Sequence, residues 1–147
     1  MYPFLKRAFD ISSSSIVLVI LFPIIIFISI LIKINSKGSI LYKGIRAGKG
    51  NNSFYLYKFR TMINNAEGGH TTALNDPRLT TIGRLLRKYK LDEIPQFVNV
   101  VLGDISLVGP RPQVRYYTDQ YKGEDTIILS VKPGITDLAT IYFMDMT

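Results

Sequence analysis

The 147-residue sequence contains no cysteine and only one histidine, His70. The absence of cysteine excludes disulfides and thiolate metal sites, and it is consistent with a reducing compartment. His70 therefore has neither a cysteine nor a second histidine with which to share a metal ion. Because it lies in the polar segment 63–75, we predict a solvated loop histidine. The length is that of one domain with a modest core.

Acidic residues are also scarce, and none occurs between Asp10 and Glu67. The same interval holds seven cations: Lys33, Lys37, Lys43, Arg46, Lys49, Lys58 and Arg60. The formal net charge of the chain is +7, and its isoelectric point is about 9.7. Charge of one sign over such a length indicates a surface that faces anions. The partner classes that it allows are nucleic acid, anionic membrane lipid and a phosphorylated small molecule.

Charge of either sign is missing from residues 16–32, an apolar run of seventeen residues with Pro23 near its middle. A straight helix of that length rises roughly 25 Å, which is short of the roughly 30 Å hydrocarbon core of a bilayer. Proline removes a backbone donor and clashes with the preceding turn, so we expect a bend at Pro23.

Both flanks of the apolar run are basic, with Lys6 and Arg7 before it and Lys33 after it. Positive flanks favour the cytoplasmic side, so both ends are expected on the same face of the membrane. We therefore predict that residues 1–36 form a re-entrant helix, which enters one leaflet, bends and returns. A single spanning helix and a buried helix of a soluble core are the alternatives. A signal peptide is disfavoured because no small-residue cleavage site follows.

Residues 39–43 and 54–61 have the composition of two β-strands, and the glycine- and asparagine-rich segment 44–52 between them is typical of a turn. The alternation of side chains along a strand places Lys58 and Arg60 on one face. Two cations at one end of a strand face are a candidate phosphate clamp. A pair of solvated surface charges explains the same spacing equally well.

The segment 76–90 has apolar residues at helical spacing after an Asp-Pro start signal, which predicts an amphipathic helix. Its polar face carries five cations: Arg78, Arg84, Arg87, Lys88 and Lys90. A basic amphipathic helix is typical of an element that lies on a membrane or faces phosphate.

Two adjacent carboxylates, Asp92 and Glu93, stand at the start of a second predicted helix, 91–102, because Pro95 suits a first helical turn. Acidic residues are common at helix N-termini for capping alone. Adjacent carboxylates repel, however, so their ionisation needs nearby cations such as Arg87, or a metal ion. A carboxylate can also attack phosphorus as a nucleophile while its neighbour holds Mg²⁺ on a phosphate.

Arg111 lies between two prolines in the segment GPRP, which restricts its backbone. An arginine held in this way is a good bidentate ligand for phosphate. The segment VKPGIT repeats the pattern more weakly, with Lys132 next to Pro-Gly. The candidate phosphate ligands are thus five cations: Arg60, Arg87, Lys90, Arg111 and Lys132.

The segments KRAFD, YKFRTM, KLDEIPQFVNVVLGDISLVGPRP and KPGIT occur in this order, with the proline-broken apolar run between the first two. In this arrangement most of the chain resembles the bacterial sugar transferases, which are monotopic phosphoglycosyl transferases. The resemblance implies a mixed α/β fold, with a re-entrant membrane helix at 1–36 and a catalytic domain at 37–147 on the cytoplasmic face of a bacterial inner membrane. It also implies transfer of a sugar phosphate from a UDP-sugar to polyprenol (undecaprenyl) phosphate, with release of UMP and with Mg²⁺ as cofactor.

The same resemblance implies roles for individual residues. Asp92 would attack the sugar-bearing phosphate and form a covalent phosphosugar, which the lipid phosphate then displaces. Glu93 would hold Mg²⁺ together with Asp92, or assist deprotonation. Lys58, in the YKFRTM match, and Arg111, in the GPRP match, would neutralise the phosphates.

The chain departs from the family pattern at three places. Phe22 precedes Pro23 where the family often has Ser-Pro, and Met144 stands about where an arginine often binds nucleotide phosphate. Members usually continue some tens of residues beyond PGIT, whereas this chain ends at Thr147. We therefore expect a minimal or C-terminally short member.

Two other functions compete with the transferase. One is a non-catalytic, membrane-anchored protein that binds polyprenol phosphate or nucleotide. The other is a membrane-tethered nucleic-acid binder, weakly supported by the aromatic and basic residues of YLYKFR. An acidic pair would repel nucleic acid, so we expect no such partner. Self-association as a homo-oligomer is left open.

Overall fold

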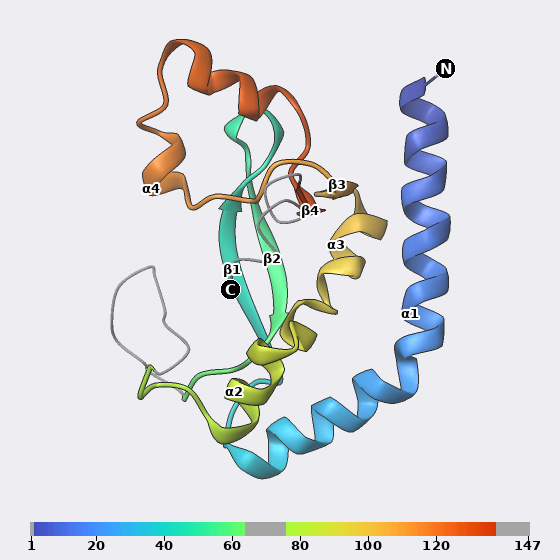
Figure 1. Ribbon diagram of the computed structural model, residues 1–147, viewed down its shortest axis with the longest axis vertical. Coiled ribbons are helices and arrows are strands. Elements are labelled where there is room, and N and C mark those ends of the chain that lie inside the picture. The colour runs from blue at the N-terminus through green and yellow to red at the C-terminus, as the bar shows by residue number, and fades with distance from the viewer. Residues whose placement is uncertain (1, 64–75, 138–147) are drawn as a thin grey trace.

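The computed structural model describes residues 2–63 and 76–137 of the chain. His70, predicted to lie in a loop, and Met144 fall outside the described residues. The described part consists of a long N-terminal helix and a small domain of mixed helices and strands (Figure 1). The predicted fold class, an apolar N-terminal helix followed by a small α/β domain, is confirmed.

Helix α1 (Tyr2–Asn35) contains the whole apolar run and extends well beyond it towards the N-terminus. Figure 1 shows the ribbon of α1 bent near its middle, and Pro23 lies inside the helix. The segment Pro3–Asn35 is long and apolar enough to cross a membrane, and its most apolar 18-residue stretch has a mean hydropathy of 3.2. Only 11% of its most apolar stretch is buried, so α1 is not the central helix of a soluble core.

The second half of α1 contributes to the main hydrophobic core. Ile28 and Ile32 are buried on its inner side, where they pack with Phe59, Leu86 and Ile94 of the α/β domain. Burial of side chains of this size stabilises a fold by about 1.5–3 kcal/mol each. The apolar helix and the domain therefore share one core.

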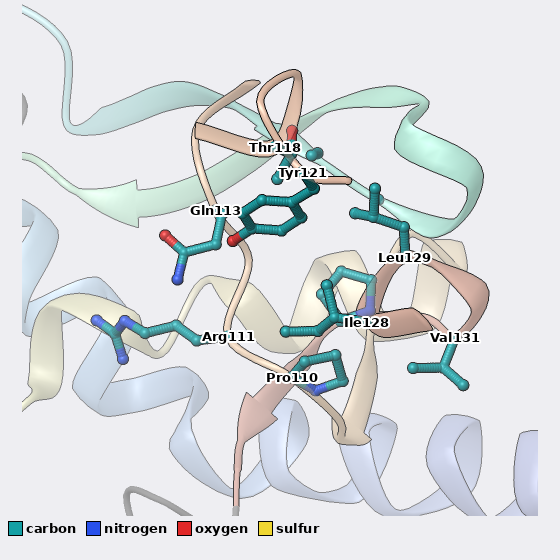
Figure 2. Close-up of a pocket in the computed structure, with 11 residues that line it drawn as sticks. Pro110, Arg111, Gln113, Thr118, Tyr121, Ile128, Leu129 and Val131 are labelled. Carbon is teal, nitrogen blue, oxygen red and sulfur yellow. The ribbon is translucent and has the colours of Figure 1, made fainter. Parts of the chain in front are cut away.

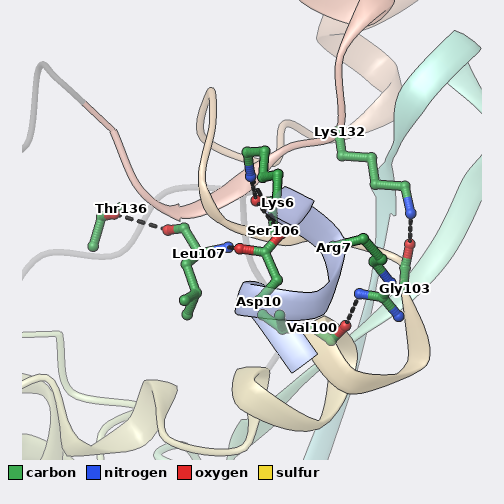
Figure 3. Close-up of polar contacts among 9 residues, drawn as sticks. All are labelled: Lys6, Arg7, Asp10, Val100, Gly103, Ser106, Leu107, Lys132 and Thr136. Atoms are coloured by element: carbon green, nitrogen blue, oxygen red, sulfur yellow. Dashed lines mark hydrogen bonds and ion pairs between the residues drawn. The ribbon is translucent and has the colours of Figure 1, made fainter. Parts of the chain in front are cut away.

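The first turns of α1 are held to the domain by polar contacts (Figure 3). Arg7 donates from Nη1 to the carbonyl of Val100 at 2.5 Å and from Nη2 to that of Val101 at 2.9 Å. The buried Asp10 accepts a hydrogen bond from Ser106 Oγ at 2.8 Å. Both ends of α1 are therefore attached to the same domain.

Strands β1 (Leu41–Ala47) and β2 (Ser53–Phe59) form an antiparallel hairpin. The turn between them contains the short helix η1 (Lys49–Asn51). The second strand was predicted within two residues at each end. The prediction for the first strand was wrong in extent, because the segment 44–52 contributes four residues to β1. Gly44 is buried within that strand, so this glycine serves packing there and does not form a turn.

Helix α2 (Thr81–Lys88) begins later than the predicted helix 76–90. The hydroxyl of Thr80 accepts a hydrogen bond from the Gly83 amide at 2.9 Å, which caps the helix at this point. Asp76 does not start the helix; its Oδ2 binds Arg78 Nη2 at 2.6 Å in the preceding turn. The prediction is corrected to a turn followed by a short helix.

The predicted helix 91–102 is interrupted. A single 3₁₀ turn, η2 (Leu91–Glu93), precedes helix α3 (Gln96–Leu102), for which Pro95 is the N-cap. Lys90, with φ 54° and ψ 21°, is left-handed and separates α2 from η2. The acidic pair thus lies just before a helix, as predicted, but in a turn of its own.

The remaining chain forms a second, parallel sheet. Strand β3 (Ser106–Val108) pairs with β4 (Gly134–Thr136), and α4 (Arg115–Thr118) and η3 (Gly123–Ser130) lie between them in sequence. A second buried cluster connects β2 with α3 and the start of this sheet: Leu56, Val100 and Ile105.

Candidate active site

The acidic pair occupies the η2 turn between Lys90 and Pro95. Asp92 is almost fully buried, with 8% of its surface exposed, and the side chain of Glu93 is 20% exposed. The left-handed conformation before the turn and the fixed φ of proline after it restrict the backbone on both sides. The two carboxylates are therefore held in one short, rigid turn.

Two cations from distant parts of the sequence reach this pair, as predicted. Lys58 Nζ, from β2, lies 2.5 Å from Glu93 Oε1. Arg111 Nη2, from the GPRP segment, lies 3.7 Å from the same oxygen. The Arg111 side chain is 58% exposed, and a guanidinium has five N–H donors. Arg111 can therefore bind an incoming anion while it remains close to Glu93.

The two carboxylates differ in their electrostatic environments. Burial raises the pKa of Asp92; the charge of Lys58 opposes this increase, and that of Glu93 adds to it. Burial also disfavours ionised Glu93, but attraction to Lys58, Arg111 and Lys90 outweighs it, so the pKa of Glu93 is lowered. Glu93 is thus the firmly ionised partner of the cations. Asp92 is the less stabilised anion, which is the more reactive kind of carboxylate.

Arg87 also acts on Asp92, because its positive charge lowers the pKa of that carboxylate. The Arg87 Nε donates a hydrogen bond to Thr61 Oγ1 at 3.0 Å, and Thr61 is only 6% exposed. A Cβ at Gly83 would lie 2.0 Å from the Thr61 carbonyl oxygen, so the crossing of α2 over this segment requires glycine. Thr61 and Gly83 were missed in the sequence, although Thr61 belongs to the YKFRTM stretch.

Asn99 is a further residue near the site that no sequence pattern indicated. Its side chain is fully buried, donates to the Tyr55 carbonyl at 2.7 Å and accepts from the Tyr57 amide at 2.9 Å. These bonds tie α3 to β2, and so fix the acidic pair relative to Lys58. An asparagine within an apolar helical run offers little signal of such a role.

Arg60 does not join this cluster. It is 8% exposed, and its guanidinium donates to the carbonyls of Ser36 and Lys37, both at 2.8 Å. Strand β2 ends at Phe59, so the strand alternation that paired it with Lys58 no longer applies. Arg60, predicted as a phosphate ligand, holds the segment that follows α1 in this structure.

Lys132 lies at the opposite end of α3 from the acidic pair. Its Nζ donates to the carbonyl of Gly103 at 2.6 Å, next to the Arg7 contacts (Figure 3). Gly103 is the C-cap of α3, where unpaired carbonyls favour a cation. Lys132, predicted as a phosphate ligand, thus has its ammonium group at the C-terminal end of α3 and not beside the acidic pair.

Asp92 and Glu93 are the carboxylates that this cluster offers to a metal ion. Within residues 2–63 and 76–137, no group of three or more histidine, cysteine, aspartate or glutamate side chains is placed to hold a metal. Mg²⁺ usually binds proteins through one or two carboxylates and completes its shell with water and substrate phosphate. Asp92 and Glu93, next to Arg111, therefore fit Mg²⁺ that is shared with a bound phosphate.

The fold and the site define a small α/β domain that combines an apolar N-terminal helix with a cation-flanked pair of carboxylates. The family model described as bacterial sugar transferase matches residues 1–147, and the chain belongs to this family.

Three relatives illustrate the similarity. The chain is 39% identical over 145 residues to the UDP-N-acetylgalactosamine-undecaprenyl-phosphate N-acetylgalactosaminephosphotransferase of Aeromonas hydrophila, covering 95% of this chain and 34% of that protein. It is 39% identical over 137 residues to the uncharacterized sugar transferase EpsL of Bacillus subtilis (strain 168), covering 93% and 68%. It is 37% identical over 142 residues to the UDP-glucose:undecaprenyl-phosphate glucose-1-phosphate transferase of Escherichia coli (strain K12), covering 93% and 31%. The chain thus spans about a third of the length of two of these relatives.

Proposed function

We propose that this protein transfers a sugar phosphate from a UDP-sugar to undecaprenyl phosphate and releases UMP. The names of two relatives state a UDP-sugar and undecaprenyl phosphate as substrates. The observation that carries the proposal to these residues is the buried Asp92 beside the Lys58–Glu93 ion pair of 2.5 Å. A poorly solvated carboxylate next to fixed cations is suited to attack a phosphate group.

In the first step, a carboxylate oxygen of Asp92 forms a bond to the phosphorus that bears the sugar. The bond from this phosphorus to the oxygen that bridges to UMP breaks, and that oxygen keeps the electron pair. No proton transfer is required, because a phosphate monoester is largely ionised at neutral pH. Lys58 and Arg111 neutralise the charge on the phosphate oxygens, which lets two anions approach each other.

In the second step, an oxygen of undecaprenyl phosphate attacks the same phosphorus. The bond to Asp92 breaks, its electron pair returns to the carboxylate, and the free enzyme is restored. One phosphoanhydride is made for each one broken, so the overall reaction needs no further energy source. Glu93 stays ionised throughout and keeps Lys58 in place beside the reacting group.

Mg²⁺ is proposed as the cofactor, held by Glu93 and Asp92 together with a substrate phosphate. When bound, it supplies further neutralisation of phosphate charge. Removal of divalent cations with EDTA is expected to abolish UMP release in a coupled assay, and added Mg²⁺ should restore it. Full activity in EDTA would contradict this assignment.

We also propose that α1 is re-entrant and that the domain lies on the cytoplasmic face of the inner membrane. Arg7 and Asp10 at one end, and Ile28 and Ile32 at the other, contact the same domain. A helix attached to one folded body at both ends is compatible with return to one face, and the basic flanks favour the cytoplasm. Cysteines at positions 3 and 37 should both react with impermeant reagent only from the cytoplasmic side. Labelling from opposite sides would mean a spanning helix.

The test of the chemistry is intact-protein mass spectrometry after incubation with UDP-sugars in the absence of lipid acceptor. The wild-type protein should gain the mass of one phosphosugar, and Asp92→Asn should not. Asp119→Asn changes an exposed carboxylate that accepts from Asn51 and Arg115, and it is the matched control, which should be labelled like the wild type. Turnover by Asp92→Asn at the wild-type rate would overturn the mechanism. Binding of UDP-sugar without a mass increase in any variant would instead indicate a non-catalytic binder.

A further inference from the structure

A pocket lies next to the GPRP segment, close to α4 and η3 (Figure 2). We call it the Tyr121 pocket, and six residues form much of its lining: Pro110, Arg111, Gln113, Tyr121, Ile128 and Val131. Arg111 belongs to this lining and also reaches the acidic pair, because its Nη2 lies 3.7 Å from Glu93 Oε1. The pocket and the acidic pair are therefore joined by a single arginine side chain.

The Tyr121 pocket combines apolar walls with two polar tips. Figure 2 shows Pro110 and Ile128 on one side and the ring of Tyr121 on the other. The amide of Gln113 and the hydroxyl of Tyr121 point to the same side of the view as the Arg111 guanidinium. Among residues 2–63 and 76–137, neither of these two polar groups has a hydrogen-bond partner. Both are thus available to a ligand.

The rim of the pocket is held in place by the hairpin. The carbonyl of Gln113 accepts a hydrogen bond from the Ala47 amide at 2.9 Å, at the end of β1. Thr118, buried on α4, donates to the Asn51 side chain at 2.7 Å. A main-chain bond and a side-chain bond therefore fix the two segments that carry Gln113 and Tyr121.

The chemistry of these walls suits a planar heterocycle. Aromatic side chains stack on the faces of nucleobases, and a glutamine amide offers one acceptor and two donor positions. These positions match the hydrogen-bonding edge of a pyrimidine, which also presents donors and acceptors side by side. Pro110 and Ile128 can cover the other face of the ring.

We infer that the Tyr121 pocket binds the nucleoside of the sugar nucleotide, with the base against the Tyr121 ring and its polar edge on Gln113. The inference rests on the proposed function. In phosphoryl transfer the attacking and leaving oxygens lie roughly in line, so the leaving nucleoside phosphate lies across the phosphorus from Asp92. Arg111 connects the acidic pair to the pocket and is placed to bind that phosphate.

Binding of UMP and of ribose 5-phosphate, measured by titration calorimetry on the full chain, tests the inference. The two ligands share the phosphate and the ribose, and only UMP carries the base. Tyr121→Ala is expected to weaken UMP binding by about tenfold or more, because a stacked base is lost. Gln113→Leu should weaken it by about fivefold to tenfold. Neither change should alter the affinity for ribose 5-phosphate by more than about twofold.

Tyr117→Ala is the matched control, because Tyr117 is a neighbouring tyrosine of α4 outside the pocket lining. It should bind both ligands like the wild type. Wild-type affinity for UMP in both pocket variants would overturn the inference while leaving the transferase proposal standing. A wild-type protein that binds UMP no tighter than ribose 5-phosphate would count against base recognition altogether. If Tyr121→Ala lost both ligands through misfolding, Gln113→Leu at the pocket rim would decide by the same comparison.

Discussion

The two ends of α3 both gather positive charge, but they do so for different reasons. Before its first residue, Lys58 and Arg111 surround the acidic pair at 2.5 and 3.7 Å from Glu93. At its C-terminal end, Arg7 and Lys132 donate to main-chain carbonyls at 2.5–2.9 Å. The first group faces carboxylates that carry charge, and the second faces the main-chain carbonyls of a helix end.

This difference shows that the group a lysine or arginine contacts indicates, better than its residue type, whether it can take part in the reaction. The donors of Arg7 and Lys132 are directed at the backbone, so these residues act on the placement of α1 and of the segment before β4. Arg111 contacts Glu93 with one nitrogen at 3.7 Å and is 58% exposed. It therefore keeps donors for a phosphate.

The largest effect on the rate of UMP release is expected from replacing Lys58, the lysine near the N-terminal end of α3. Lys58→Met should lower the rate of UMP release at least about 100-fold, because a fixed cation that stabilises the reacting phosphate is lost. Lys132→Met is the matched control and should change the rate by less than about twofold. Rates are measured under saturating UDP-sugar and lipid. Equal losses in the two variants would show that both ends of α3 take part in the chemistry.

A smaller loss of activity is expected when Arg87 loses its hydrogen bond to Thr61. Thr61→Val removes the hydroxyl that accepts from Arg87 at 3.0 Å and should lower kcat/KM about tenfold, the effect of one hydrogen bond to a charged group. Thr61→Ser keeps the hydroxyl and should restore most of the activity.

A purely structural role for Thr61 can be separated from this one by the pH profile. Because the charge of Arg87 lowers the pKa of Asp92, a displaced guanidinium should move the acidic limb of kcat/KM to higher pH in Thr61→Val. An unchanged limb would remove Arg87 from the neighbourhood of the nucleophile.

At the other end of α3, stability should change while chemistry does not. Arg7→Met breaks two hydrogen bonds to carbonyls and should cost about 1.5–3 kcal/mol, which corresponds to a melting temperature lower by about 3–12 °C for a chain of this size. Thermal unfolding in detergent measures it. Arg84→Met, an exposed arginine of α2, is the control and should leave the melting temperature unchanged. An equal shift in both variants would indicate a general effect of net charge.

The smallest effect distinguishes the two carboxylates. The folded-state pKa of Asp92 is raised, so its charged form destabilises the fold at neutral pH. The folded-state pKa of Glu93 is lowered, so its charged form stabilises the fold. Asp92→Asn should therefore raise the melting temperature at pH 7 by a few degrees, and Glu93→Gln should lower it by a similar amount, about 2–4 °C for each kcal/mol. Shifts of the same sign would contradict the asymmetry.

The sequence predicted the centre of the site because its residues lie in segments with strong local signals. The acidic pair before Pro95, the arginine between two prolines and Lys58 on a regular strand all took the expected places. Arg60 does not share a strand face with Lys58, because β2 ends at Phe59 and strand alternation was extended one residue too far.

The position of Lys132 and the extent of the first strand could not be predicted, for other reasons. The position of Lys132 depends on the parallel pairing of β3 with β4, which joins segments far apart in sequence and leaves no local pattern. Gly44 was interpreted as a turn residue, although a glycine can equally be buried inside a strand. Thr61 and Gly83 meet only through tertiary packing, so spacing could not have paired them.

The contribution of α1 to the main core has a practical consequence for handling the protein. A shortened version that begins after residue 35 would lose Ile28 and Ile32, and Phe59, Leu86 and Ile94 would become exposed to water. It would also lose Arg7, which donates hydrogen bonds to the C-terminal end of α3. Such a fragment would be prone to aggregation, and purification in detergent with the helix retained is the route to an intact site.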